Sequence, residues 1–236
     1  MPTDSFRSHG RDIPLELFAG SGHGSHPAVV LVYGTRGMNA PFGAMIRTFA
    51  TKLSSTGCTA LIPNYFAATD TRASADIAGD IAVMDAVPSN RDVWIDTLGD
   101  CLAYAAARAD ANSDRLGLLG FSLGGHLTLR TAKRQGLPRV RAVVSFFAPI
   151  NQAPFEGIGG DLDKMPPLQI HHGEDDGPPV SPEESCALEA ALVAAGKVKD
   201  RDYEIFFYAG QGHGFNGQAA RTSETRTVDF LSKKLA

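Results

Sequence analysis

The sequence predicts an α/β fold with a mostly parallel central sheet and helices on both of its faces. Short apolar runs of strand length alternate with segments of helical periodicity, and several runs are continuously apolar, as in strands buried on both faces. Strands that alternate with helices need crossover connections, which join parallel neighbours. We expect one domain over residues 1–236, because a single α/β domain reaches about 250 residues and no repeat or linker interrupts the chain.

Strands and helices are both expected in the first half of the chain. The first is an edge strand, because Pro14 is tolerated at the edge of a sheet but not in a central strand. Residues 64–90 allow two interpretations, a helical excursion over the functional site or a surface connection. The expected elements are an edge strand at 13–18, a buried strand at 28–33, a helix at 42–54, a strand at 57–63 and a helix at 92–109.

The second half continues the alternation. A short apolar run from Arg115 leads into a glycine-flanked turn at Ser122 and then into a helix. A later helix has its own boundary signals: Ser181 is expected as N-cap, Glu184 completes a capping box, and Gly196 follows the C-terminus. The other expected elements are strands at 139–147, 167–172 and 202–208, an irregular segment at 151–167 and a final helix at about 223–234.

Composition excludes several classes of partner. The net charge is −4, 20% of residues are charged, and no run of like charges indicates nucleic acid or an anionic membrane surface. The N-terminus lacks the apolar region of a secretion signal, and no apolar run approaches the ~18–20 residues of a membrane span. We therefore expect a soluble, cytoplasmic protein. Cys58, Cys101 and Cys186 match neither a disulfide framework nor a zinc site, and we expect them to be small core residues.

The turn at Ser122 is the first candidate site. Gly120 and Gly124 flank the serine in a Gly-x-Ser-x-Gly pattern that lies between a predicted strand and a predicted helix. A serine on such a sharp turn presents its hydroxyl above the edge of the sheet, and the glycines allow neighbouring backbone to pass close by. The pattern also occurs in ordinary strand–helix turns with an idle serine, so Ser122 needs partners to be catalytic.

Three loops, each following a predicted strand, hold a serine, an aspartate and a histidine. These are Ser122, either Asp175 or Asp176, and His213. A serine hydroxyl needs a base to become a nucleophile at neutral pH, and an imidazole serves because its pKa lies near the working pH. A carboxylate in turn fixes the tautomer of the imidazole and stabilises the imidazolium. The order Ser, Asp, His along the chain is the order expected for this architecture.

Other histidines and aromatic residues fit no catalytic pattern. His126 lies one helical turn after Ser122 without an evident carboxylate partner, and His171 and His172 are expected on opposite faces of a strand. No cluster of metal ligands is evident, so we expect no metal and no cofactor. Four aromatic residues could either line an apolar pocket or pack in the core: Tyr65, Phe146, Phe147 and Phe155.

The chain resembles the α/β-hydrolase superfamily, and within it the dienelactone hydrolase family. The matching stretches are Val29–Gly37, Gly57–Pro63, Gly120–Gly125, His172–Asp176 and Gly210–Phe215, which together span nearly the whole chain. The resemblance implies the single-domain α/β-hydrolase fold and a hydrolytic activity.

By this resemblance, Ser122 is the nucleophile and His213 the base. The family places its acid three residues after the glycine that ends the strand, which favours Asp176 over Asp175. The backbone amides of Thr35 and Leu123 fall where the family builds its oxyanion hole.

The chain departs from the family pattern at three places. Dienelactone hydrolases carry a cysteine where this chain has Ser122, a glutamate near Gly34, and a substrate-binding arginine shortly after the histidine, where residues 216–218 are uncharged. These departures put the dienelactone substrate in doubt, although Arg36 could supply a positive charge at the pocket mouth. We therefore expect a serine hydrolase that cleaves a small carboxylic ester or lactone. A thioesterase or peptidase with the same residues, or a non-catalytic binding module, are the alternatives; the sequence does not predict the oligomeric state.

Overall fold

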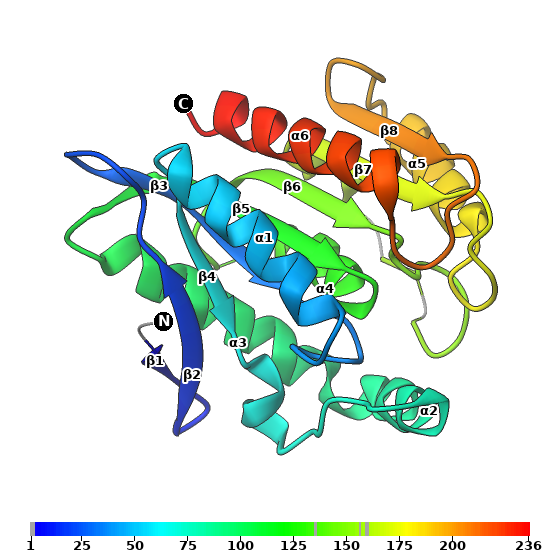
Figure 1. Cartoon of the computed structure of the whole chain (residues 1–236), viewed down its shortest axis with the longest axis horizontal. Coiled ribbons are helices and arrows are strands. Elements are labelled where there is room, and N and C mark those ends of the chain that lie inside the picture. Colours follow the sequence, from blue (N-terminus) through cyan, green and yellow to red (C-terminus); the bar gives the residue numbers. More distant parts are fainter. Residues whose placement is uncertain (1–2, 135, 156, 159–160) are drawn as a thin grey trace.

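The structure is a computed structural model that describes residues 3–134, 136–155, 157–158 and 161–236. Its centre is one eight-stranded sheet in the order β1-β2-β4-β3-β5-β6-β7-β8 (Figure 1). The strands are β1 Thr3–Ser8, β2 Arg11–Phe18, β3 His26–Val32, β4 Thr59–Pro63, β5 Ala111–Phe121, β6 Val140–Phe146, β7 Leu168–Gly173 and β8 Tyr203–Tyr208. β3 to β8 run parallel to one another, and β2 pairs antiparallel with both β1 and β4, so the expected mostly parallel sheet is confirmed.

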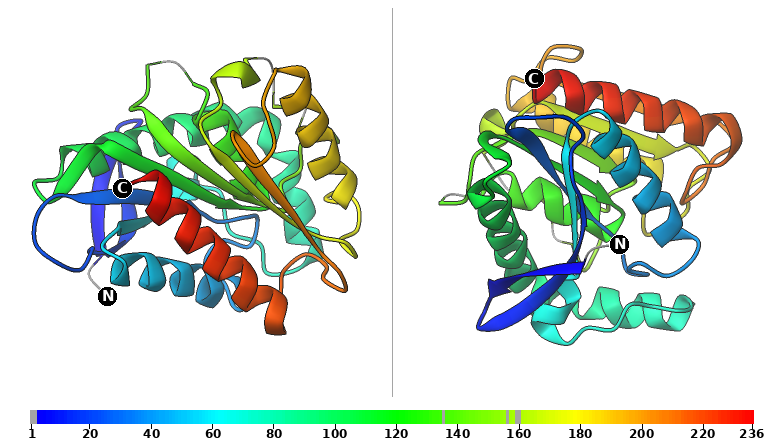
Figure 2. Two further views of the ribbon diagram at one scale, coloured as in Figure 1. Left: turned by 90° about the horizontal axis from the view of Figure 1, so that it is seen from above. Right: turned by 60° about the vertical axis from the view of Figure 1, so that its left-hand side comes forward.

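Helices cover both faces of this sheet, as expected. α1 and α6 lie on one face, and α3, α4 and α5 lie on the other (Figure 2). The α-helices are α1 Phe42–Ser55, α2 Ile77–Asp85, α3 Val87–Ala107, α4 Leu123–Thr131, α5 Pro182–Ala194 and α6 Gly217–Lys234, and short 3₁₀ turns span Tyr65–Thr69 and Leu162–Lys164. None of the described helices combines the length and the apolar character that crossing a membrane requires.

The parallel strands determine where the site can form. Residues of β3, β4 and β5 such as Val30, Leu61 and Leu118 are fully buried, which is why their apolar runs are continuous. The loops that follow parallel strands all emerge at one edge of the sheet. The loops after β3, β5, β6, β7 and β8 therefore lie together although they come from five separate parts of the chain.

The expectation of an edge strand at 13–18 is wrong. β2 pairs with β1 on one side and β4 on the other, and β1 itself was not expected. Pro14 is tolerated because its carbonyl accepts from the Asn64 amide at 2.8 Å, just beyond the end of β4. In an extended residue the N–H and C=O point to the same side, which for Pro14 is the side of β4. The N–H that Pro14 lacks would therefore point beyond the end of β4, where the ladder between β2 and β4 has ended.

Two expected details at the ends of helices are also corrected. Glu184 makes no capping box, since its carboxylate instead accepts from the amides of Ile150 and Asn151 in the loop after β6. Gly196 does follow α5 with φ +79°, as a C-terminal glycine should. Helices α3 and α6 begin earlier than expected.

The expectation for the cysteines holds in part. Cys58 and Cys101 are buried core residues, whereas Cys186 is exposed. Cys186 lies on α5, and only one stripe of a helix on the surface of a sheet can face the core.

His171 is a fully buried polar residue between the sheet and α6. Its Nδ1 lies 2.8 Å from the Tyr208 hydroxyl and its Nε2 lies 2.8 Å from Gln169 Oε1, so both ring nitrogens have partners. Burial, and secondarily the positive charge of Arg226, lower the pKa of His171 from 6.5 to about 3. The ring is therefore neutral in the folded protein at a pH where an unfolded chain would protonate it.

This difference predicts a pH-dependent stability. Below about pH 6.5 His171 is protonated in the unfolded chain but stays neutral in the folded protein. The free energy of unfolding therefore falls on acidification until the pH approaches the lowered pKa of His171. We expect His171→Gln to remove roughly 1 kcal/mol per pH unit from this slope between about pH 6 and 4, measured by urea denaturation. The exposed His23 provides the control, since His23→Gln should leave the slope unchanged. Equal slopes for wild type and His171→Gln would contradict the prediction.

Candidate active site

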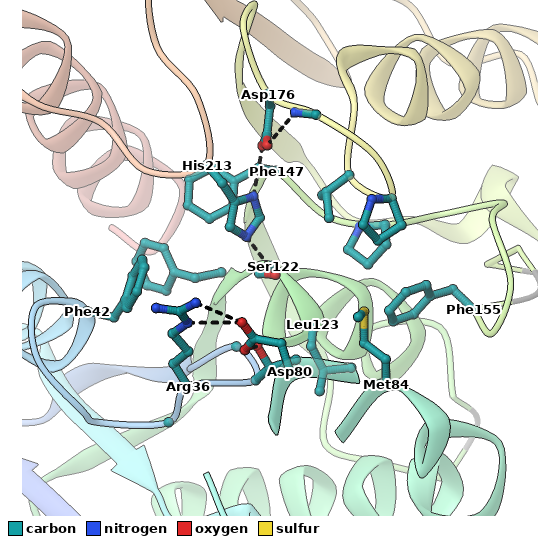
Figure 3. Close-up of a pocket in the computed structure, with 18 of the residues that line it drawn as sticks. Arg36, Phe42, Asp80, Met84, Ser122, Leu123, Phe147, Phe155, Asp176 and His213 are labelled. Carbon is teal, nitrogen blue, oxygen red and sulfur yellow. Dashed lines mark hydrogen bonds and ion pairs between the residues drawn. The ribbon is translucent and has the colours of Figure 1, made fainter. Parts of the chain in front are cut away.

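Ser122 occupies a strained turn between β5 and α4. Its φ is +56° and its ψ is −123°, a conformation that costs a non-glycine residue about 1–3 kcal/mol. The Ser122 amide donates to the Phe146 carbonyl at 2.9 Å, and its carbonyl accepts from the His126 amide at 3.1 Å. These bonds hold the turn, from which the Ser122 side chain reaches His213 (Figure 3).

Glycine is required on both sides of this turn by close contacts of the backbone. A Cβ on Gly124 would lie 2.1 Å from the Val32 carbonyl oxygen, and one on Gly120 would lie 2.3 Å from the Gly124 carbonyl oxygen. The first turn of α4 is thus pressed against the end of β3. This contact brings the loop after β3, with Gly34 and Thr35, next to Ser122, and a Cβ on Gly34 would be 3.0 Å from the Ser122 Cβ.

His213 and Asp176 complete a hydrogen-bonded chain with Ser122. His213 Nε2 lies 3.0 Å from Ser122 Oγ, and His213 Nδ1 lies 2.8 Å from Asp176 Oδ2 (Figure 3). The Phe147 ring packs against the imidazole with 4.6 Å between centroids. The Asp175 amide donates to the Gln211 carbonyl at 2.9 Å, which ties the aspartate loop to the histidine loop. The structure therefore brings together all three residue types expected from the sequence.

Asp176, rather than Asp175, faces His213. The Asp176 side chain is only 3% exposed, whereas Asp175 is exposed. Burial raises the pKa of Asp176, but the polar contacts with His172 and His213 outweigh burial and hold this pKa below its ordinary value. The carboxylate also accepts from the Gly177 amide at 3.0 Å. Asp176 is therefore ionised at neutral pH and able to accept from His213 Nδ1–H.

His172 lies close to the carboxylate of Asp176. Its Nε2 lies 2.8 Å from the Val180 carbonyl, which can only accept, so Nε2 carries a proton, and its Nδ1 lies 2.6 Å from the Ser185 hydroxyl. The distance from His172 Nε2 to Asp176 Oδ2 is 3.6 Å, beyond a direct hydrogen bond. His171 contacts Thr227 of α6 and His172 contacts Ser185 of α5, so the two rings lie on opposite faces as expected.

Thr35 and Leu123 carry the two amides that the family resemblance implies as oxyanion donors. Leu123 is the first residue of α4, where an N–H has no partner within the helix, and Thr35 lies in the loop after β3. Among the described residues, neither amide donates a hydrogen bond to another protein group. Both residues line the same cavity as Ser122.

A cavity of about 400 Å³ opens in front of Ser122 and His213. Its wall comes mainly from apolar side chains of α1, α2 and the loops after β6 and β7, and its size is that of a small-molecule site. The apolar lining residues are Phe42, Met45, Ile46, Met84, Phe121, Leu123, Phe147, Pro149, Phe155, Pro178, Pro179 and Val180. Of the four aromatic residues with two possible roles, Phe147 and Phe155 line the cavity, whereas Tyr65 and Phe146 are buried in the core.

Two charged residues line the cavity besides Asp176 and His213. Arg36 follows β3 and Asp80 belongs to α2, and the two form an ion pair in which Arg36 Nε and Nη2 both donate to Asp80 Oδ2 (Figure 3). Asp80 was missed by the sequence analysis, which left residues 64–90 undecided. The structure supports the excursion over the site, since Asp80 and Met84 reach the cavity from α2.

The structure also bears on His126 and on a possible metal site. His126 is buried away from the cavity, with Nδ1 at 2.9 Å from the Pro149 carbonyl and Nε2 accepting from Arg130. Burial and the charge of Arg130 lower the pKa of His126 to about 3, so this ring is neutral. Among the residues that the structure describes, no three His, Cys, Asp or Glu side chains are grouped so as to hold a metal ion.

The sequence pattern of the dienelactone hydrolase family matches residues 13–233, which is nearly the whole chain. The chain belongs to this family. A relative from Bradyrhizobium sp., named a "probable 2-oxo-3-(5-oxofuran-2-ylidene)propanoate lactonase", is 24% identical over 201 residues, which cover 82% of this chain and 75% of the relative. The dienelactone hydrolase family is a hydrolase family, so the coarse class of activity follows from membership.

Solved structures agree with the fold of this dienelactone hydrolase family member. The dienelactone hydrolase-like promiscuous phosphotriesterase P91 from metagenomic libraries has a TM-score of 0.78 at 18% identity, over 100% of this chain and 98% of its own. The carboxylesterase EstE1, cloned from a metagenomic library, has a TM-score of 0.74 at 15% identity, over 100% of this chain and 89% of its own. At such identities these similarities establish the α/β-hydrolase fold alone.

The close approach at Gly124 predicts a large effect from one added methyl group. In Gly124→Ala the new Cβ meets carbonyl oxygens of Val32 and Tyr33 at 2.1 and 2.4 Å, so α4 must move away from β3. We expect a loss of about 2 kcal/mol in the free energy of unfolding, measured with urea. Gly177→Ala is the matched control, because nothing lies within 4 Å of its Cβ. Equal stability of the two variants would contradict the packing argument.

Proposed function

We propose that the protein is a serine hydrolase that cleaves a small carboxylic ester or lactone through an acyl-enzyme on Ser122. The observation that carries the proposal is the unbroken chain of short polar contacts from Asp176 through His213 to Ser122 at an apolar cavity. A serine, an imidazole and a buried carboxylate in this sequence of contacts form a catalytic triad. Each step below uses only protein groups and water.

Acylation starts when Ser122 Oγ attacks the carbonyl carbon while His213 Nε2 takes the hydroxyl proton. Ionised Asp176 stabilises the imidazolium, and the amides of Thr35 and Leu123 donate to the oxyanion. The intermediate then breaks the bond between carbon and leaving oxygen, and His213 returns its proton to that oxygen. In a lactone the released alcohol stays part of the acyl group.

Deacylation repeats these steps with water as the nucleophile. His213 takes a proton from the water as its oxygen attacks the acyl carbon, and the second oxyanion forms in the same place. Collapse breaks the bond to Ser122 Oγ, which recovers the proton from His213 and releases the carboxylic acid. The cavity of about 400 Å³ has room for a small substrate, with the apolar wall contacting its acyl or alcohol part.

Several features support an ester or lactone over the alternatives. The relative from Bradyrhizobium sp. is named as a probable lactonase. A thioesterase or a peptidase could use the same residues, and rates on matched ester, thioester and amide substrates separate these activities. A binding module has no need for a serine held at 3.0 Å from an imidazole on a strained turn. The cytoplasmic location expected from the sequence stays a prediction.

A fluorophosphonate probe tests the nucleophile directly. The purified protein should gain one adduct by intact mass, and peptide mapping should locate it on Ser122, because the probe reacts with an activated serine. Ser122→Ala should abolish labelling and lower ester turnover by roughly 10⁴-fold or more. Folded protein that gains no adduct, or a Ser122→Ala variant that keeps its turnover, would contradict the proposal and favour the binding module.

The identity of the acid is tested by two adjacent substitutions. Asp176→Asn keeps the size of the side chain but removes the charge that orients His213, so we expect kcat to fall by about 10⁴-fold. Asp175→Asn alters an exposed neighbour and should change kcat less than about threefold. Steady-state kinetics on one ester measures both. A larger loss from Asp175→Asn than from Asp176→Asn would reverse the assignment.

A further inference from the structure

The carboxylate of Asp80 gathers three donors from the loop that follows β3. Arg36 donates from Nε at 3.1 Å and from Nη2 at 2.8 Å to Oδ2, and the Thr35 hydroxyl donates to Oδ1 at 2.7 Å. A planar guanidinium that binds one carboxylate with two N–H groups is held in a fixed orientation. One residue of α2 therefore contacts two consecutive residues at the site, one of which is a proposed oxyanion donor.

Further bonds fix the same loop against the segment before α2. The Ser74 amide donates to the Thr35 carbonyl at 2.9 Å, and Asn39 Nδ2 donates to the Ser74 carbonyl at 3.0 Å. The Asp80 side chain is 19% exposed and that of Arg36 is 36% exposed, so the pair is partly shielded from water. The orientation of Arg36 at the cavity is thus built into the fold rather than left to a free surface side chain.

The pair determines the charge that a substrate meets. Burial raises the pKa of Asp80, but its hydrogen bonds with Arg36 and Thr35 outweigh burial and lower the pKa, so both partners are charged at neutral pH. Among the described residues, Arg36 is the only lysine or arginine that lines the cavity. An anionic substrate group would have to compete with Asp80 for Arg36, whereas a neutral group meets a pair with no net charge.

Resting on the proposed ester hydrolysis, we infer that Asp80 is a specificity-determining residue that neutralises Arg36 and makes the cavity select esters and lactones without a free carboxylate. Removing the charge of Asp80 leaves Arg36 able to attract an anionic substrate. Removing the charge of Arg36 leaves Asp80 to repel it. Removing both charges leaves this pair of positions with no net charge, as in the wild type.

A charge series tests this inference with two substrate pairs that differ in one carboxylate. In the first pair the charge is in the acyl part, mono-p-nitrophenyl adipate against its methyl ester. In the second it is in the alcohol part, 4-butanoyloxybenzoate against 4-butanoyloxybenzamide. The measured quantity is the ratio of kcat/KM for the anionic ester to that for its neutral partner. Because both rates come from one preparation, loss of folded protein in a variant cancels from the ratio.

The wild type should prefer the neutral ester of each pair. Asp80→Asn, which keeps an acceptor for Thr35, should raise the ratio by roughly fivefold in at least one pair, as expected for an exposed or half-exposed charge contact. Arg36→Gln should lower the ratio by a similar factor, and the double variant should return it to the wild-type value. The shifts should shrink in about 0.5 M salt because added ions screen them.

The ion pair between Arg47 and Glu16 provides a matched control. Its guanidinium likewise donates two hydrogen bonds to one carboxylate, at 2.8 and 2.6 Å. Its side chains are 34% and 19% exposed, but neither residue lines the cavity. Glu16→Gln should therefore leave the ratio unchanged. A purely structural role of Asp80 would lower the rates on both esters of a pair together.

The possible failures are distinguishable. If the wild type hydrolyses the neutral esters but the ratios stay constant across the series, the inference about Asp80 is overturned and the proposed function stands. If the wild type hydrolyses none of the four esters, the proposed ester hydrolysis is overturned, and with it the inference.

Discussion

The contact between the first turn of α4 and the end of β3 is the constraint on which the site depends. Gly124 lies so close to the carbonyl oxygens of Val32 and Tyr33 that no side chain fits between them. This contact places Ser122 beside the loop that carries Thr35, so the proposed nucleophile and one proposed oxyanion donor are positioned by the same packing. The positive φ of Ser122 is tolerated because both adjoining elements are buried in the core.

A second close approach positions the other half of the site. A Cβ on Gly173 would lie 2.2 Å from the Gln211 carbonyl oxygen, so the end of β7 is pressed against the loop that carries His213. Backbone contacts therefore hold the loops of Asp176 and His213 together, independently of the hydrogen bond between the two side chains. Such positioning matters because a carboxylate can orient an imidazole only if the ring has no alternative orientation of similar energy.

The sequence was sufficient to predict the parallel sheet, because buried strands leave continuous apolar runs. It was also sufficient to predict that Ser122 and His213 lie together, because the loops after parallel strands meet at one edge of the sheet. The residue types alone left Asp175 and Asp176 open, and only the resemblance to the family favoured Asp176. One step along a loop turns a side chain from the solvent to the interior. The capping box failed for a related reason. Glu184 satisfies two amides more than thirty residues away, and local patterns contain no information on such distant partners.

Asp80 illustrates how distant charges decide the chemistry of a site. Arg36 taken alone indicates a cation that could bind a substrate carboxylate, and the opposite conclusion follows only from its pairing with a residue 44 positions away. An arginine with both nitrogens bound to one carboxylate is oriented, but it offers little net field to a ligand. Within a wall that is otherwise apolar, this pair therefore stabilises the loop of Thr35 without making the cavity cationic. Shape and apolar contact are then left as the main determinants of which ligand fits the cavity.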